Sequence, residues 1–230
     1  MQNNNKLKFV VLNFALILFL NFGYGQTNNI TVRFIGNCGL YMTDGTSNIY
    51  FDFPYKSGAH HYSEYNLSEL DSVKNHPVFI YTHRHSDHFS GRLVRKLSKK
   101  LDGQIFTPRN AEKLKNLNKE LKDFTIEPIH TKHHFSFNHY SYLITWHNKK
   151  IFISGDTETS DTIATQKDLD WAFVPVWLLV DAMEKKINLG GISKMFAIYH
   201  IGPRDQITNA AADPKIKLLN KQGERIAISY

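Results

Sequence analysis

The stretch Thr82-His83-Arg84-His85-Ser86-Asp87-His88 places three imidazoles and a carboxylate within seven consecutive residues. The apolar run at 78–81 before it indicates a buried strand, and apolar residues spaced by four from Phe89 to Leu101 predict a helix after it. The cluster should therefore lie in a turn at the carboxyl end of a strand, where ligands gather in α/β sheets. Because imidazole nitrogen and carboxylate oxygen are ligands that Zn²⁺ and similar ions prefer, the stretch predicts a metal site.

Two residues further along the chain follow strand patterns in the same way. Asp156 comes directly after the pattern at 150–154, and His200 stands between the pattern at 195–199 and a Gly-Pro turn. Either residue alone is more typical of a turn aspartate or a locally packed histidine. Their joint placement at strand ends, together with the first cluster, predicts that both are ligands.

The rest of the chain alternates strand and helix patterns, which predicts an α/β fold without internal repeats. We predict strands at 30–35, 40–42, 48–53, 78–81, 105–106, 124–129, 140–146, 150–154, 171–176 and 195–199. Helices are predicted at 67–73, 89–101, after Pro108, and at 177–187 and 210–219. Asp44-Gly45 is a hairpin signal between the second and third strands, Asn148-Lys149 is a predicted turn, and 54–65 is predicted to be a loop over one face.

The first residues have the pattern of a secretory signal peptide. Lys6 and Lys8 form a basic start, an apolar stretch covers 9–22, and Gly23 and Gly25 supply small residues where cleavage is expected. An uncleaved anchor is the alternative, since a stretch of this length spans a bilayer only marginally. No cysteine lies at the end of the apolar stretch, which argues against a bacterial lipoprotein.

We therefore expect residues 1–25 to be a signal peptide and residues 26–230 to form a single domain. The domain would be exported to the periplasm or secreted, with no stable membrane span after cleavage. Cys38 is the sole cysteine, so the chain cannot form an internal disulfide. We interpret Cys38 as a turn or core residue.

Charge gives little reason to expect a nucleic-acid partner. Removal of Lys6 and Lys8 with the signal peptide lowers the formal net charge from +7 to +5. The basic residues concentrate at 92–100 and 113–122 with helical spacing, which favours solvated outer helix faces. No interleaving of aromatic and basic residues supports a nucleic-acid groove. The sequence carries no signal for an oligomeric state.

The ordered motifs His83-x-His85-x-Asp87-His88, Asp156 and His200 resemble the metallo-β-lactamase superfamily of metal-dependent hydrolases, over nearly all of residues 26–230. The resemblance implies a four-layer αββα sandwich with a dinuclear site at one edge. It implies that His83, His85 and a later histidine hold one ion. Asp87, His88 and His200 would hold the other, with Asp156 bridging the two. The ions would be Zn²⁺, with Mn²⁺ or Fe as alternatives.

The third histidine has to come from the segment 130–139, which contains four candidates. In the family this ligand falls just past one strand and before the next, so we predict His133, with His130 and then His134 as alternatives. His139 is expected to begin the next strand and to pack or hydrogen-bond locally. Phe89-Ser90-Gly91 departs from the Gly pair of many relatives, which should alter the helix start without removing a ligand.

The resemblance further implies hydrolysis by a hydroxide that the two ions activate, with Asp87 orienting it and moving its proton. Asp156 argues against a typical β-lactamase, which lacks an aspartate there. Ester, lactone and phosphodiester bonds remain, in a small-molecule or lipid-like substrate. The alternatives are an iron-dependent oxidoreductase on the same fold and a non-catalytic metal-binding protein. Five residues either line a substrate pocket or belong to the surface and core: His60, His61, Tyr62, Tyr65 and Trp177.

Overall fold

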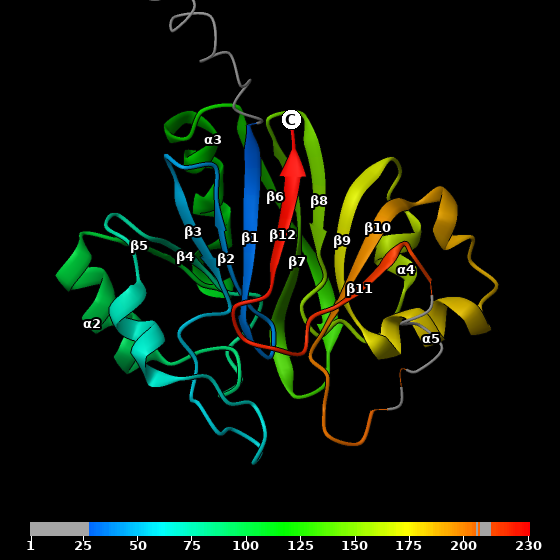
Figure 1. Cartoon of the computed structure of the whole chain (residues 1–230), viewed down its shortest axis with the longest axis horizontal. Coiled ribbons are helices and arrows are strands. Elements are labelled where there is room, and N and C mark those ends of the chain that lie inside the picture. Colours follow the sequence, from blue (N-terminus) through cyan, green and yellow to red (C-terminus); the bar gives the residue numbers. More distant parts are fainter. Residues whose placement is uncertain (1–27, 206, 208–212) are drawn as a thin grey trace, which may run out of the picture.

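Two six-stranded sheets face each other in the computed structural model, which describes residues 28–205, 207 and 213–230 (Figure 1). The first sheet has the order β12-β1-β2-β3-β4-β5 and the second the order β11-β10-β9-β8-β7-β6. The strands of the first sheet are β1 (Asn29–Gly36), β2 (Gly39–Thr43), β3 (Asn48–Phe51), β4 (Val78–Ile80), β5 (Gln104–Phe106) and β12 (Arg225–Ser229). Those of the second are β6 (Phe124–His133), β7 (Ser136–Trp146), β8 (Lys149–Ile153), β9 (Leu169–Pro175), β10 (Ser193–Tyr199) and β11 (Ile216–Leu218).

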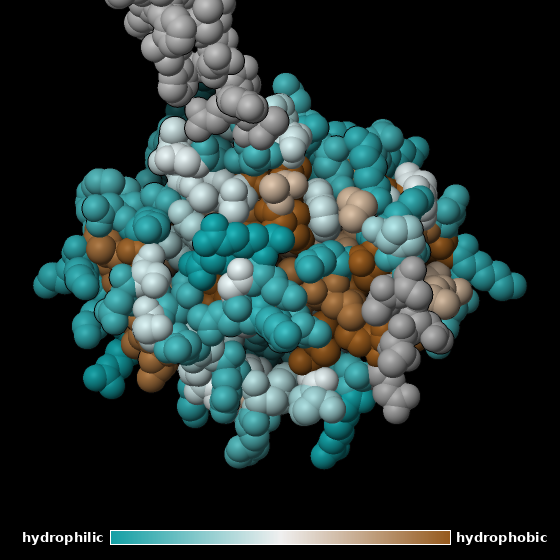
Figure 2. Space-filling view, in the orientation of Figure 1, coloured by the Kyte–Doolittle hydropathy of each residue, from teal (hydrophilic) through white to brown (hydrophobic). Residues whose placement is uncertain are grey.

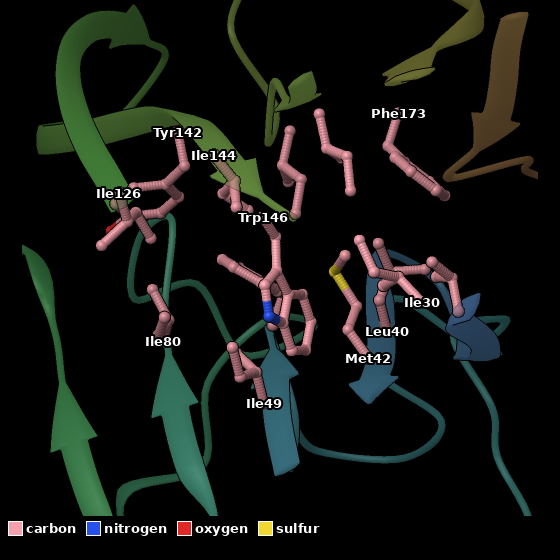
Figure 3. Close-up of a cluster of buried hydrophobic side chains, with 14 of the residues drawn as sticks. Ile30, Leu40, Met42, Ile49, Ile80, Ile126, Tyr142, Ile144, Trp146 and Phe173 are labelled. Atoms are coloured by element: carbon pink, nitrogen blue, oxygen red, sulfur yellow. The ribbon is translucent and has the colours of Figure 1, made fainter. Parts of the chain in front are cut away.

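The main core lies between the sheets, where apolar side chains from the facing sides of both sheets meet (Figure 3). Met42 and Ile49 of the first sheet meet Trp146 and Phe173 of the second in this core. A fully buried side chain of this size gains about 1.5–3 kcal/mol from leaving water, which makes this layer the main source of stability.

Helices pack on the outer faces of both sheets and complete four layers. Val94 and Leu97 of α2 (Gly91–Leu101) are buried against the first sheet, and Leu178 and Leu179 of α5 (Val176–Glu184) are buried against the second. The other helical segments are α3 (Leu117–Glu120), α4 (Asp161–Ala164) and 3₁₀ turns at Leu67–Ser72, Pro108–Asn116 and Leu189–Gly191. The αββα sandwich predicted from the sequence is therefore confirmed.

The outer surface of α2 carries the predicted basic face, with Arg92, Arg95 and Lys99 exposed. Hydrophilic side chains cover most of the face shown in Figure 2. Within the described residues, no helix is long and apolar enough to cross a membrane. The predicted signal peptide at 1–25 lies outside these residues.

Two sequence predictions near the carboxyl end were wrong. The helix predicted at 210–219 is a strand over Ile216–Leu218, which pairs in parallel with β10, while 210–212 lie outside the described residues. The strand β12 was not predicted at all and pairs with β1. In both cases a sheet edge offers backbone partners that outweigh local propensity.

Smaller differences concern the ends of elements. The strands predicted at 124–129 and 140–146 extend into one long hairpin, β6 to β7, and the turn after β7 lies at His147-Asn148 rather than Asn148-Lys149. The helix predicted at 177–187 runs from Val176 to Glu184, and the helices at 67–73 and after Pro108 are largely 3₁₀ turns. The hairpin between β2 and β3 forms around Asp44-Gly45 as predicted.

Candidate metal centre

The turn after β4 presents four of the predicted ligands, and a buried carboxylate holds it in shape. Asp52, just after β3, accepts hydrogen bonds from the backbone N–H and hydroxyl of Thr82, both at 2.7 Å. It also accepts one from Nδ1 of His88 at 2.9 Å. The two ends of the turn are therefore tied to one side chain, and His83, His85, Asp87 and His88 project from a fixed loop.

His83 is oriented as a ligand by this network. The Thr82 hydroxyl donates its proton to Asp52, so it accepts at 3.0 Å from Nδ1–H of His83. The proton on Nδ1 leaves a lone pair on Nε2, and Nε2 is buried without a hydrogen-bond partner. Burial also lowers the pKa of His83 well below its usual value, so the ring is neutral.

His133 joins His83 and His85 in one group. One nitrogen from each ring lies within 4.8 Å of the other two, and Nε2 of His133 is 3.1 Å from Nδ1 of His85. His133 comes from the end of β6 and so brings the second sheet to the turn of the first. The other candidates point elsewhere: His130 contacts the ring of Tyr140, and His134 pairs with Glu158 at the surface.

A second group forms around Asp156, which follows β8. Its Oδ2 lies 3.1 Å from Nε2 of His88 and 3.2 Å from Nε2 of His200. The same oxygen is 4.0 Å from Nε2 of His83 and 3.9 Å from Nε2 of His133. This one carboxylate oxygen therefore lies between the two groups of histidines.

Asp87 lies beside the second group. Its Oδ2 is 3.4 Å from Nε2 of His200 and 3.6 Å from Nε2 of His88. Asn37 fixes the residue by donating from Nδ2 to the Asp87 backbone carbonyl at 2.9 Å and to Oδ2 at 3.2 Å. Oδ1 of Asp87 is buried without a hydrogen-bond partner, although the more exposed Nε2 of His60 is 3.4 Å away. The structure thus brings together all seven residues predicted from the sequence.

His139 supports the loop that carries Asp156. Its Nε2 accepts from the Asp156 backbone N–H at 2.9 Å, so Nδ1 carries the proton and donates to Thr131 at 2.7 Å. Gly155 has a positive φ of 58°, and a Cβ there would lie 2.7 Å from both the His139 ring and Thr82. Close packing and the positive φ therefore both require glycine at position 155.

Buried charges are balanced within the centre. Burial by itself raises the pKa of Asp156, but His200 and His88 outweigh it and hold that pKa well below its usual range. Burial lowers the pKa of His88, but Asp156 and Asp52 outweigh it and raise the pKa to about 10. Burial also lowers the pKa of His200, but Asp156 and Asp87 outweigh burial and raise that pKa to about 10. In the chain alone, protonated imidazoles neutralise the carboxylates.

These observations fit a pair of metal ions. The donor set is imidazole and carboxylate, the Nε2 atom of His83 has no hydrogen-bond partner among the described residues, and the carboxylates require positive charge. His83, His85 and His133 would hold one ion, and His88, His200 and Asp87 the other, with Asp156 shared. A divalent cation would replace the protons that balance the charge in its absence.

Sequence reasoning missed three residues of the centre. Asn37 positions Asp87, Asp52 orients His88, and Cys38 belongs to the same group of ligand atoms as His88, Asp156 and His200. Asn37 and Cys38 form the Gly-Asn-Cys-Gly turn between β1 and β2. A polar pair between glycines at a strand end was the available signal. For Asp52 the available signal was a polar residue directly after a strand.

A cavity of about 490 Å³ opens beside His200. Its walls include His60, His61, Tyr62 and Trp177, together with Arg204. Tyr65, in contrast, is buried in the core under the first sheet. Four of the five residues considered for a pocket therefore line this cavity, and Tyr65 does not line it.

Comparison with known proteins places the fold. No family model matches the sequence, and no curated protein matches it. Igni18, a metallo hydrolase from Ignicoccus hospitalis, is similar with a TM-score of 0.66 at 14% identity, over 88% of this chain and 99% of that one. YhfI, a metallo-β-lactamase fold protein from Bacillus subtilis, gives 0.62 at 14% identity, over 86% and 99%. CmlA, a diiron β-hydroxylase from Streptomyces venezuelae, gives 0.56 at 9% identity, over 89% of this chain and 54% of that one. The chain has the metallo-β-lactamase fold.

Proposed function

We propose that this protein is a metal-dependent hydrolase with two divalent ions, cleaving an ester, lactone or phosphodiester bond. The observation that carries the proposal is the position of Asp156 Oδ2, which is within 4.0 Å of histidines from both groups. Two ions held this way would activate water as the nucleophile and polarise the scissile oxygen. Zn²⁺ is the proposed metal because three imidazoles make up one of the two groups.

Asp87 is the proposed proton acceptor. Its Oδ1 has no hydrogen-bond partner among the described residues, with Nε2 of His60 3.4 Å away, and Asn37 fixes the other side of the carboxylate. A carboxylate held in this way is able to orient a water molecule and take its proton. Nearby imidazoles hold the pKa of Asp87 below its usual range in spite of burial, so the group is ionised near neutral pH.

The cavity beside His200 is the proposed site for the rest of the substrate. Tyr62 and Trp177 offer aromatic faces, and Arg204 and the histidines suit an anionic group, although Asp205 also lines the cavity. A similar structure is a diphosphatase from the PhnP family, with a TM-score of 0.54 at 16% identity over 83% of each chain. These features support a substrate with a phosphoryl or carboxylate group. Export of the protein, proposed from residues 1–25, would place that substrate outside the cytoplasm.

The test is hydrolysis by metal-free protein reloaded with Zn²⁺. The panel consists of a p-nitrophenyl ester, an aliphatic lactone and bis(p-nitrophenyl) phosphate, with metal content measured by mass spectrometry. We expect two ions per chain and turnover of at least one substrate class. Asp87→Ala should lower that turnover by about a hundredfold or more, as removal of a general base does. Asp161→Ala, at an exposed residue, is the matched control.

An iron-dependent oxidoreductase is the second candidate, favoured by the likeness to a diiron β-hydroxylase. Iron in protein purified without added metal, with no hydrolysis of any substrate after Zn²⁺ loading, would support it. Metal binding without either activity would support a non-catalytic protein. Failure to bind any metal while folded would overturn the proposal.

A further inference from the structure

Cys38 is a core residue, as predicted, and it also borders the metal centre. It occupies the turn between β1 and β2 and is fully buried. Its Sγ is 3.5 Å from Oδ1 of Asp156. One ligand atom each from Cys38, His88, Asp156 and His200 lies within 4.8 Å of the other three. Four donor atoms from four separate segments thus converge on one point.

Unpartnered polar atoms elsewhere in the same metal centre also point to a bound ion. The Nε2 atom of His83 and Oδ1 of Asp87 are buried polar atoms without hydrogen-bond partners. His83 is 4.0 Å from the same Asp156 carboxylate that Cys38 approaches. Buried polar atoms normally have partners, so these two atoms indicate that the centre as a whole binds a group that the protein does not supply.

The backbone holds the thiol in place from both sides. The amide of His200 donates to the Asn37 carbonyl at 2.9 Å, and the Asn37 side chain donates to the Asp87 carbonyl at 2.9 Å. Asn37 has a positive φ of 50°, and a Cβ on Gly39 would lie 3.0 Å from the Gly36 carbonyl oxygen. The turn therefore has little freedom to move Cys38 away from the neighbouring ligands.

We propose that Cys38 is a thiolate ligand of the ion held by His88, His200 and Asp156. Binding breaks the S–H bond, forms a sulfur–metal bond and releases the proton to solvent. A sulfur ligand makes this position softer than the three-histidine position and favours Zn²⁺ or Co²⁺ over Mn²⁺ or Mg²⁺. The inference rests on the proposed metal centre and is independent of which bond is hydrolysed.

Co²⁺ titration of the metal-free protein tests this directly, because thiolate ligation gives a near-ultraviolet charge-transfer band. Cys38 is the sole cysteine of the chain, so any such band has only one source. We expect the band to rise with Co²⁺ and to be lost in Cys38→Ser, while visible d–d bands persist in that variant. Competition between Zn²⁺ and Mn²⁺ should shift towards Mn²⁺ in the same variant. Circular dichroism of Cys38→Ser and Cys38→Ala checks folding.

The outcomes separate the two proposals. Visible d–d bands without a charge-transfer band in the unmodified protein would overturn sulfur ligation and leave Cys38 as a hydrogen-bond donor to Asp156. No cobalt spectrum at all would overturn the metal centre itself. If neither variant folds, the Co²⁺ titration of the unmodified protein decides: d–d bands without the charge-transfer band overturn the proposal.

Discussion

Asp52 Oδ2 and His88 Nδ1 are joined by a hydrogen bond of 2.9 Å between two side chains that are 1% and 0% exposed. The carboxylate fixes the proton on Nδ1, which leaves Nε2 of His88 directed at Asp156. A carboxylate that orients a ligating histidine in this way typically contributes to metal affinity as well as to ring position. The link joins the end of β3 to the turn after β4.

Asp52→Asn should therefore weaken metal binding while the fold persists. Asparagine keeps one accepting oxygen; when that oxygen accepts from the Thr82 amide, the NH₂ group faces His88 Nδ1 and favours the tautomer with the proton on Nε2, which blocks that atom. We expect metal affinity to fall by about 10–100-fold, measured by competition with a chromophoric chelator. Asp102→Asn changes an exposed Asp–His pair and serves as the control. Unchanged affinity in Asp52→Asn would show that His88 is not a ligand through Nε2.

Asp156→Ala tests the shared carboxylate. Because the same oxygen faces both groups of histidines, its loss should lower metal content from about two ions per chain to about one. The control is Glu158→Ala, which removes a carboxylate of the same loop that pairs with His134. Mass spectrometry of the dialysed proteins gives the metal content. Two ions retained by Asp156→Ala would contradict the bridging position.

Arg204→Gln tests the charge of the substrate cavity. If Arg204 contacts an anionic group, its loss should raise KM for a phosphodiester by about tenfold, equivalent to one charged hydrogen bond of about 1.5 kcal/mol. KM for a neutral ester should not change. Arg109→Gln, at an exposed arginine outside the cavity, should leave both unchanged. A parallel rise of KM for both substrates in Arg204→Gln would point to a general disturbance of the loop instead.

The sequence predicted the parts of the site that depend on local pattern. His83 to His88 are close in the chain, and Asp156 and His200 follow recognisable strands. Asn37 and Asp52 were missed because each acts through a partner 50 or 36 residues away, which no local pattern reports. Only the folded arrangement of the strands brings Asn37 to Asp87 and Asp52 to His88.

The hairpin of β6 and β7 shows why the third histidine was hard to choose. The alternation that buries Phe124 and Ile126 has moved by one residue at Thr131, and the register shifts again between Thr131 and His133. A bulge of this kind redirects side chains and leaves little trace in sequence. The helix predicted at 210–219 failed for a related reason, since Ile216–Leu218 extend a sheet edge.

Gly155→Ala should lower stability and distort the centre. The added Cβ would meet the His139 ring and Thr82 at 2.7 Å, in addition to the strain of a positive φ. Gly45 also has a positive φ but has no atom within 4 Å of such a Cβ, so Gly45→Ala isolates the backbone strain. We expect a loss of about 1–2 kcal/mol for Gly45→Ala and a larger loss for Gly155→Ala in urea unfolding. Equal losses would mean that the loop relaxes around the new methyl group.

Asp44 gives a prediction for stability against pH. It links two turns, since it accepts at 2.8 Å from the Ser47 amide and lies 3.0 Å from Nε2 of His147. Burial raises its pKa, but these hydrogen bonds outweigh burial and lower the pKa to about 2. An unfolded aspartate titrates near about 3.9, so the native state gains stability from the ionised form.

That contribution is fully present above about pH 4 and is lost as the pH falls towards about 2. Urea unfolding of the unmodified protein and Asp44→Asn at both ends of this window measures it. The unmodified protein should be more stable than Asp44→Asn at the higher pH, and the difference should shrink at the lower pH. Asp71→Asn, for which no such bonds hold the carboxylate, controls for the loss of one surface charge. A difference that stays constant with pH would mean that Asp44 acts through packing rather than through its charge.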